Sequence, residues 1–194
     1  MKKLICLLAV LMLTTVSYAQ DVQNHLKFKG VPIDGTLNEY VSKMKQKGFR
    51  YQGTEDGTAL LEGDFAGYKK CVIGVSTLKQ KDLVSKIAVI FPSCDTWGTL
   101  GNNYFSLKEM LTEKYGNPKE VVEEWQSYSQ PDNDNEKMYN VKFDKCKYYT
   151  IFETTDGDIQ LSISHNGVLS CFVVLVYFDR INSNVIRNEA MDDL

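Results

Sequence analysis

A pattern that occurs twice constrains the fold more than any other feature of this sequence. Each copy opens with a capping box, in which a Ser or Thr is followed three residues later by a Glu, at Thr36–Glu39 and at Ser106–Glu109. Such a box predicts the first turn of a helix. Apolar residues then follow at the spacing of one helical stripe, and each predicted helix ends at a glycine suited to a left-handed C-cap, Gly48 and Gly116. The pattern therefore predicts two amphipathic helices in equivalent places.

Short runs typical of β-strands follow each predicted helix. Turn signals such as Asp56-Gly57 and Asn166-Gly167 separate these runs and indicate antiparallel hairpins. The first set of strands is predicted at residues 49–52, 58–65, 69–77 and 84–91, and the second at 120–129, 147–154, 158–164 and 171–178. One more strand is predicted at 26–31, and the stretch 130–140 is predicted to be a polar loop.

These patterns predict an α+β fold made of two tandem units, each with one helix and about four antiparallel strands. One amphipathic helix cannot cover a four-stranded sheet by itself. We therefore expect the units to join in one curved sheet with both helices on one face, which leaves the other face to solvent or to a partner. The predicted boundaries are 1–19 for a signal peptide, 20–95 for the first unit, 96–180 for the second unit and 181–194 for a polar C-terminal tail.

Residues 1–19 have the composition of a signal peptide. A positive start and an apolar run at 4–16 lead to Ser17-Tyr18-Ala19, whose small residues at the −3 and −1 positions predict cleavage after Ala19. The longest later apolar run, at 171–178, is too short to span a bilayer and is predicted to be a buried strand. A leader that ends before Gln also resembles those of exported proteins from Bacteroidetes-type bacteria. We expect a periplasmic or secreted protein with no membrane span in the mature chain.

Four of the five cysteines lie outside the predicted leader. In an exported chain four thiols imply two disulfides, which allow three connectivities. The predicted strand layout favours pairing within each unit, as Cys71–Cys94 and Cys146–Cys171. Each bond would close a loop of about 25 residues and contribute roughly 3 kcal/mol. An all-thiolate zinc site or a redox pair is the alternative, but the sequence contains no Cys-x-x-Cys motif.

The order of the elements, the two capping boxes and the cysteine placement over residues 26–179 resemble the β-lactamase-inhibitor-protein-like fold. That fold is a tandem pair of helix-plus-four-strand units. The resemblance implies one disulfide within each unit, in keeping with the favoured pairing. It carries no inhibitory motif to any residue of this sequence, so it implies a fold rather than a function.

No motif in the sequence specifies a chemistry. The nucleophile elbow, the dinucleotide and phosphate loops and the HExxH zinc motif are all absent. Asp132, Asp134 and Glu136 alternate as calcium ligands do, but the Gly and Glu that such a loop needs do not follow. The two histidines, His25 and His165, are predicted at a strand start and a turn, and the net charge of −3 argues against nucleic acid. We therefore expect no catalytic residue, metal or cofactor, and no enzyme.

The aromatic residues of the second unit indicate a binding surface, because only one parity of each strand can face the helices. The side chains predicted to face outward are those of Trp125, Tyr149 and Tyr177. The predicted core set of the last strand is Phe172, Val174 and Phe178. We expect an exported, non-enzymatic binding protein that docks a protein or peptide on this open sheet face. The alternative is an envelope carrier that holds a small apolar or lipid ligand in a cavity between the sheet and the helices.

Overall fold

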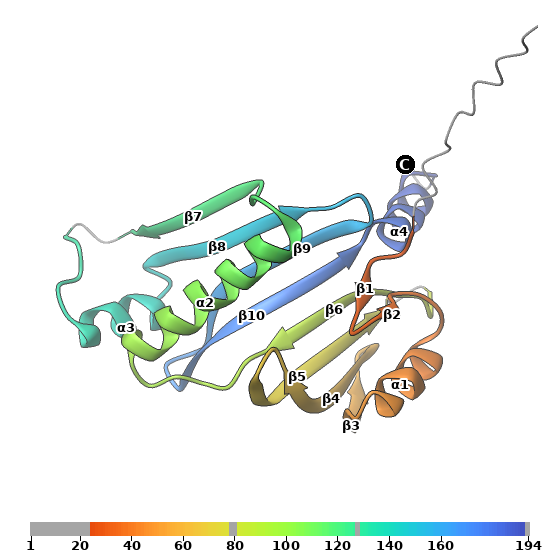
Figure 1. Ribbon diagram of the computed structural model, residues 1–194, viewed down its shortest axis with the longest axis horizontal. Coiled ribbons are helices and arrows are strands. Elements are labelled where there is room, and N and C mark those ends of the chain that lie inside the picture. The colour runs from red at the N-terminus through yellow and green to blue at the C-terminus, as the bar shows by residue number, and fades with distance from the viewer. Residues whose placement is uncertain (1–23, 78–80, 127–128, 193–194) are drawn as a thin grey trace, which may run out of the picture.

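One large sheet organises the computed structural model, which describes residues 24–77, 81–126 and 129–192 (Figure 1). The predicted leader lies outside these residues. Within them the fold is α+β and contains four helices, an eight-stranded sheet and a two-stranded sheet. The elements are β1 (Lys27–Phe28), β2 (Val31–Pro32), α1 (Leu37–Gln46), β3 (Arg50–Glu55), β4 (Thr58–Phe65), β5 (Tyr68–Thr77), β6 (Val84–Ile90), α2 (Trp97–Tyr115), β7 (Glu120–Trp125), α3 (Asp134–Lys142), β8 (Cys146–Glu153), β9 (Gly157–Asn166), β10 (Ser170–Asp179) and α4 (Arg180–Asp192).

Neighbouring strands of the large sheet are all antiparallel, in the order β3-β4-β5-β6-β10-β9-β8-β7. The chain therefore makes two meanders, β3–β6 and β7–β10, which meet where β6 pairs with β10. In this central pair Val174 lies opposite Ile90, and Val176 lies opposite Ala88. The predicted α+β class and antiparallel sheet are confirmed. The equivalence of the two halves as tandem units stays a prediction.

The first predicted helix forms as expected. The Thr36 hydroxyl accepts a hydrogen bond from the Glu39 N–H at 3.4 Å, and the Glu39 carboxylate accepts one from the Thr36 N–H at 3.0 Å. This reciprocal pair satisfies two backbone donors that the first helical turn would leave free. Gly48 follows the helix with a φ of +92°, so the predicted left-handed cap is also confirmed.

The second helix begins earlier than its predicted capping box. Helix α2 starts at Trp97 with Thr96 as its N-cap, and Ser106 lies in its interior. Asp134 accepts hydrogen bonds from the first two N–H groups of the helix, each at 3.0 Å. The local sequence hides this start because its first turns contain two glycines and two asparagines, which are poor helix formers. A carboxylate distant in the sequence stabilises the helix instead, so the prediction at Ser106 is wrong.

A helix also replaces the predicted polar loop at 130–140. Helix α3 begins after Asn133, whose side chain accepts the Glu136 N–H at 3.0 Å. The helix has almost no apolar stripe, and its buried side chains include only two large apolar ones, Met138 and Val141. Contacts with α2 and the sheet therefore hold a segment that the hydrophobic pattern does not predict.

The two ends of the described chain differ from prediction as well. The predicted polar tail at 181–194 is helix α4 over residues 180–192. The predicted strand at 26–31 is split into the β1–β2 hairpin, whose turn at Lys29-Gly30 has φ values of +52° and +77°. Both ends pack on the same end of β10, where a buried carboxylate holds them.

That carboxylate belongs to Asp179, which is fully buried at the end of β10. It accepts hydrogen bonds from the Leu26 N–H at 2.7 Å and the Asn182 N–H at 2.9 Å, and His25 Nδ1 lies 3.1 Å away. The Asn182 amide in turn donates to the carbonyl oxygens of Ile33 at 3.1 Å and Val84 at 2.8 Å. The network joins the N-terminal segment, β6 and the first turn of α4.

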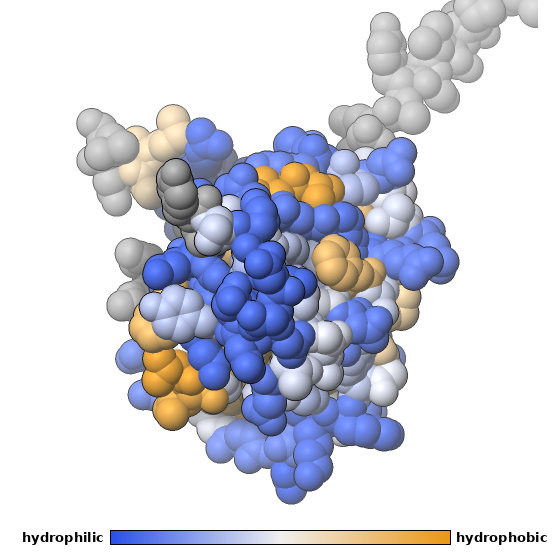
Figure 2. Space-filling model, turned by 90° about the vertical axis from the view of Figure 1, so that its left-hand side faces the viewer, coloured by the Kyte–Doolittle hydropathy of each residue, from blue (hydrophilic) through white to orange (hydrophobic). Residues whose placement is uncertain are grey.

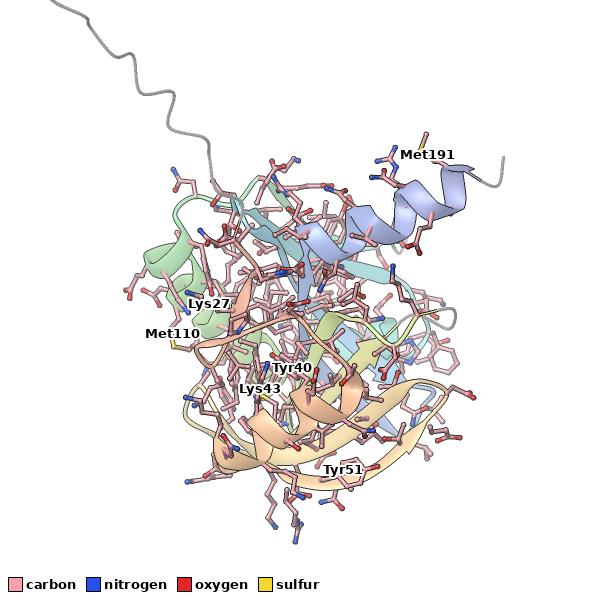
Figure 3. All side chains as sticks on the ribbon, turned by 90° about the vertical axis from the view of Figure 1, so that its right-hand side faces the viewer. Lys27, Tyr40, Lys43, Tyr51, Met110 and Met191 are labelled. Carbon is pink, nitrogen blue, oxygen red and sulfur yellow. The ribbon has the colours of Figure 1, made fainter. Side chains whose placement is uncertain are left out.

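The hydrophobic core lies between the sheet and the helices α1, α2 and α3. Helix α2 buries Tyr104, whose hydroxyl lies 2.7 Å from that of Thr150 on β8. Helix α1 buries Tyr40 and Met44 (Tyr40 is labelled in Figure 3). The large side chains of the sheet that complete the core include Leu61, Ile73, Val89, Phe152, Leu161, Val173 and Leu175.

Candidate functional site

The two faces of the large sheet differ in what covers them. Along β10 the buried residues alternate with partly exposed ones. The buried set faces the helices and consists of Cys171, Val173, Leu175, Tyr177 and Asp179. The partly exposed set consists of Ser170, Phe172, Val174, Val176 and Phe178. Figure 1 shows the sheet from the side of α1, α2 and α3. The partly exposed set therefore points to the far side, which we call the open face.

An apolar stripe crosses the open face. Val174 on β10 lies opposite Ile90 on β6, which in turn lies opposite Val72 on β5. The stripe consists of Val72, Ala88, Ile90, Phe172, Val174, Val176, Tyr149 and Ile151, with polar residues of β9 between β10 and β8. Neighbouring strands are about 4.8 Å apart, so the stripe extends about 19 Å from β5 to β8.

Tyr149 stands at the β8 end of this stripe. It lies opposite Val122 on β7 and Ser162 on β9, and its side chain is half-buried. Its hydroxyl donates a hydrogen bond to Glu120 Oε1 at 2.6 Å, and this bond to a carboxylate raises the pKa of Tyr149. The ring therefore presents an apolar face beside the stripe while its polar end is fixed at the sheet edge.

A cleft of about 420 Å³ lies at one end of the open face. Helix α4 runs to the side of the sheet opposite α2, as the positions of Met110 and Met191 show (Figure 3). The cleft lies between α4 and the sheet. Its lining includes Phe178, Glu153 and Asp158 from the sheet and Arg180, Ser183 and Asn184 from α4. The apolar stripe thus leads into a polar hollow.

The charges in the cleft are arranged around one guanidinium. Glu153 and Asp158 lie directly opposite each other on β8 and β9, where two carboxylates repel. Arg180 Nη2 lies 3.5 Å from Glu153 Oε1 and 3.3 Å from Asp158 Oδ1, and so offsets that repulsion. The Lys119 ammonium, 2.8 Å from Glu153, holds the pKa of that carboxyl below its usual value.

The outward-facing residues predicted from the sequence are only partly placed as expected. Tyr149 is on the open face. Tyr177 is buried on the helix side with its ring 5.4 Å from that of Phe28, so its predicted outward orientation is wrong. Trp125 also faces the helices, with its ring 4.7 Å from that of Trp97. The parity predicted for β10 is reversed, because Phe172, Val174 and Phe178 belong to the open face and not to the core.

The reason for the reversed parity is that both faces of β10 are apolar, so hydrophobicity alone does not choose between them. The open-face residues Phe172, Val174 and Val176 were therefore missed as candidate site residues. A cysteine signal could have found them. Free cysteine is among the most often buried residue types, and Cys171 shares its parity with Val173, Leu175 and Tyr177.

All four cysteines among the described residues are free thiols, so the predicted disulfides Cys71–Cys94 and Cys146–Cys171 are absent and that prediction is wrong. Strand β9 separates the strands that carry Cys146 and Cys171. Residues two strands apart are about 9–10 Å distant, beyond the reach of a disulfide. Cys94 lies opposite Cys171 instead, and its N–H donates to the Cys171 carbonyl at 2.8 Å.

The environment of these thiols predicts low reactivity. Burial raises the pKa of Cys71 and of Cys146 to about 11. We expect iodoacetamide at pH 7.5 to modify the partly exposed Cys146 first and the other three at least about tenfold more slowly, because little thiolate forms and access is blocked. Peptide mass mapping measures this. In urea without reductant, all four cysteines should be modified at similar rates. Modification in urea only after a reductant is added would show disulfides and contradict the structure.

The histidines serve local contacts. His165 Nε2 lies 3.0 Å from Asp144 Oδ1 and its Nδ1 lies 2.8 Å from the Gly167 carbonyl oxygen, and these contacts raise the pKa of His165. His25 contacts Asp179 as described above. Within the described residues no group of three or more His, Cys, Asp or Glu side chains is arranged to hold a metal ion. None of the described helices has the length and apolar character needed to cross a bilayer.

Other exposed apolar side chains are scattered. The end of the molecule shown in Figure 2 is mostly hydrophilic, with small separate apolar patches. The turn between β9 and β10 carries two strongly exposed apolar residues, Val168 and Leu169. Scattered apolar side chains are common on protein surfaces. The open face differs from them because its apolar residues are contiguous across β5, β6 and β10, and Tyr149 and Ile151 follow beyond the polar residues of β9.

Comparison with known proteins adds no relative. No family model, no curated protein and no solved structure matches this chain. The geometry of the open face is therefore the basis for assigning a function.

Proposed function

We propose that the protein is an exported, non-enzymatic binding protein that docks a protein segment on its open face. The observation that carries this proposal is the apolar stripe, which lies on a sheet face against which none of α1, α2 and α3 packs. A contiguous apolar surface with a polar border is typical of sites that bind another macromolecule.

The shape of the open face favours a protein over a small molecule. Small ligands bind in concave pockets, whereas the residues of the apolar stripe are spread over about 19 Å of sheet surface, from β5 to β8. A stable protein interface covers about 800 Å² on each partner, which a surface of this width can supply. Phe172 and Tyr149 offer aromatic anchors, and Glu120, Glu153 and Asp158 form a polar border.

Two further parts of the proposal come from the sequence. The signal-peptide pattern of residues 1–19, which lie outside the described residues, supports export to the periplasm or beyond. The mirrored strand order around the β6–β10 pair supports two tandem units of one helix and four strands, as in the β-lactamase-inhibitor-protein-like fold.

A photocrosslinking experiment tests the docking. A photoreactive phenylalanine analogue replaces Tyr149 on the open face, and in a matched control it replaces Tyr51. Tyr51 is 43% exposed, and its strand partner is Leu61, which is buried on the helix side. In cells that express the exported protein, the Tyr149 probe should give a discrete protein adduct that the Tyr51 probe does not give. Equal adducts from both probes would contradict a specific open face.

The affinity for the crosslinked partner then tests the apolar stripe directly. Val174→Asp removes an apolar side chain from the middle of the stripe, and Ser162→Arg adds bulk beside it. Each should weaken binding at least about 30-fold, the loss typical of a central anchor. Met110→Asp on the opposite side of the sheet is the control. Unchanged affinity in both open-face variants, with melting temperatures like that of the control, would refute the proposed site.

A further inference from the structure

A second concave site lies on the other side of the sheet, under α2. It is a cavity of about 200 Å³ between α2, β10 and the turn that joins β4 to β5. Leu175 and Tyr177 of β10 form its floor, and both are almost fully buried. Leu107 and Leu111 of α2 form one wall, and Phe65 forms another. A carrier of a small ligand, the alternative function considered from the sequence, would need a cavity of this kind between the sheet and a helix.

The mouth of this cavity has a different character from its interior. Met110 lies there and is 43% exposed, so a flexible apolar side chain borders the opening. Among the residues that the structure describes, Lys114 is the only charged one in the lining, and none of the lining side chains is acidic. Its ammonium lies 4.8 Å from the centre of the Tyr115 ring, which also lines the cavity. A cation therefore stands beside an apolar hollow without a carboxylate in the lining to neutralise it.

We propose that this cavity binds a small anionic amphiphile, with its apolar end between α2 and β10 and its anionic group at Lys114. The chemical class follows from the lining, because an apolar interior selects a hydrocarbon chain or ring and the single cation selects a negative head. The volume corresponds to about seven water molecules at about 30 Å³ each. It admits a short alkyl chain or the end of a longer one.

The site is independent of the docking proposed for the open face. Its residues come from the buried parity of β10, from α2 and from the end of β4 with the turn that follows it, whereas the open face uses the other parity of β10. The ligand is a single molecule taken from solution, because a cavity of this size beneath a helix does not fit a bilayer surface.

Calorimetric titration of the purified protein with three eight-carbon probes tests the chemical class. Octanoate should bind more tightly than 1-octanol, and 1-octanol more tightly than octyltrimethylammonium. Lys114→Gln should lower the affinity for octanoate about fivefold, which is the effect of losing an ion pair at a partly exposed position. The affinity for 1-octanol should stay unchanged. Equal affinities for octanoate and octyltrimethylammonium would overturn the proposal.

A pair of tryptophan variants tests the location. Met110→Trp places a large ring at the mouth of the cavity and should lower the affinity for octanoate at least about tenfold. Phe105→Trp is the matched control, because Phe105 is on the same helix, is equally exposed at 43% and does not line the cavity. Equal octanoate affinities of the two variants would overturn the assignment. It would also be overturned if the unchanged protein co-sedimented with phosphatidylglycerol vesicles and Met110→Trp abolished that co-sedimentation. Crosslinking at Tyr149 should be unchanged in Met110→Trp, so failure here is distinguishable from failure of the open face.

Discussion

Replacing Asp179 with alanine should lower the free energy of unfolding by about 3–5 kcal/mol, which in a chain of this size corresponds to a melting temperature lower by about 10 °C. The carboxylate is fully buried and accepts the N–H groups of Leu26 and Asn182 at 2.7 and 2.9 Å, with His25 Nδ1 at 3.1 Å. Its removal leaves these donors buried without an acceptor, and an unsatisfied buried donor costs more than the lost bond itself. Chemical denaturation followed by circular dichroism measures the change.

Asp158 offers a matched control for the Asp179 substitution, because it is a nearby carboxylate that is exposed instead of buried. Asp158 is on the neighbouring strand, opposite Phe178, and its side chain is 49% exposed in an ion pair with Arg180. Asp158→Ala should change stability by less than about 1 kcal/mol, as exposed ion pairs generally do. Asp179→Asn keeps the shape and one acceptor oxygen, so its loss should be intermediate. If Asp179→Ala and Asp158→Ala are equally stable, the network does not hold the chain ends.

The sequence predicted best what local chemistry decides. The capping box at Thr36, the glycine after α1 and the hairpin turns at Asp56-Gly57 and Asn166-Gly167 all form as predicted. Each depends on the conformational preference of two to four neighbouring residues. The antiparallel sheet follows from these turns, because short hairpins can join only antiparallel strands.

The sequence predicted poorly what distant residues decide. The start of α2 depends on Asp134, which caps it from another element, and α4 depends on the buried Asn182 and Asp179. Neither contact leaves a periodic apolar pattern in the sequence. The same holds for the cavity under α2, whose lining combines residues of α2, β10 and the β4–β5 turn that are far apart in the sequence.

The candidate site was predicted in part, because it depends both on local sequence and on contacts between distant residues. A sheet face left for a partner was predicted from the number of helices, but of the three side chains predicted on that face only Tyr149 lies there. Strand β10 is apolar at both parities, and the large aromatic residues Phe172 and Phe178 suggested a core that the helices in fact build from Val173, Leu175 and Tyr177. Choosing the face therefore required knowing which parity carries the buried Cys171 and Asp179.

Gly157→Ala should destabilise the fold by about 3 kcal/mol or more, because the new methyl group has no room. A Cβ built at this position would lie 2.1 Å from the Phe178 carbonyl oxygen and 3.2 Å from Leu26 Cδ2. The first contact is with backbone, which cannot rotate away as a flexible side chain can, so β9 and β10 would have to separate. Gly157 is the strand partner of Asp179, and their separation would also disturb the carboxylate that holds both chain ends.

Gly98→Ala provides the matched control for this substitution. Gly98 lies in the first turn of α2, where the nearest atom to an added Cβ is Asp134 Oδ1 at 4.0 Å. Alanine there should leave stability unchanged or raise it by up to about 1 kcal/mol, because a helix favours alanine over glycine. The two midpoints of unfolding, measured side by side in urea, separate a steric effect at Gly157 from the general effect of adding a methyl group. A Gly157→Ala midpoint equal to that of Gly98→Ala would mean that the ends of β9 and β10 do not approach as closely as the structure shows.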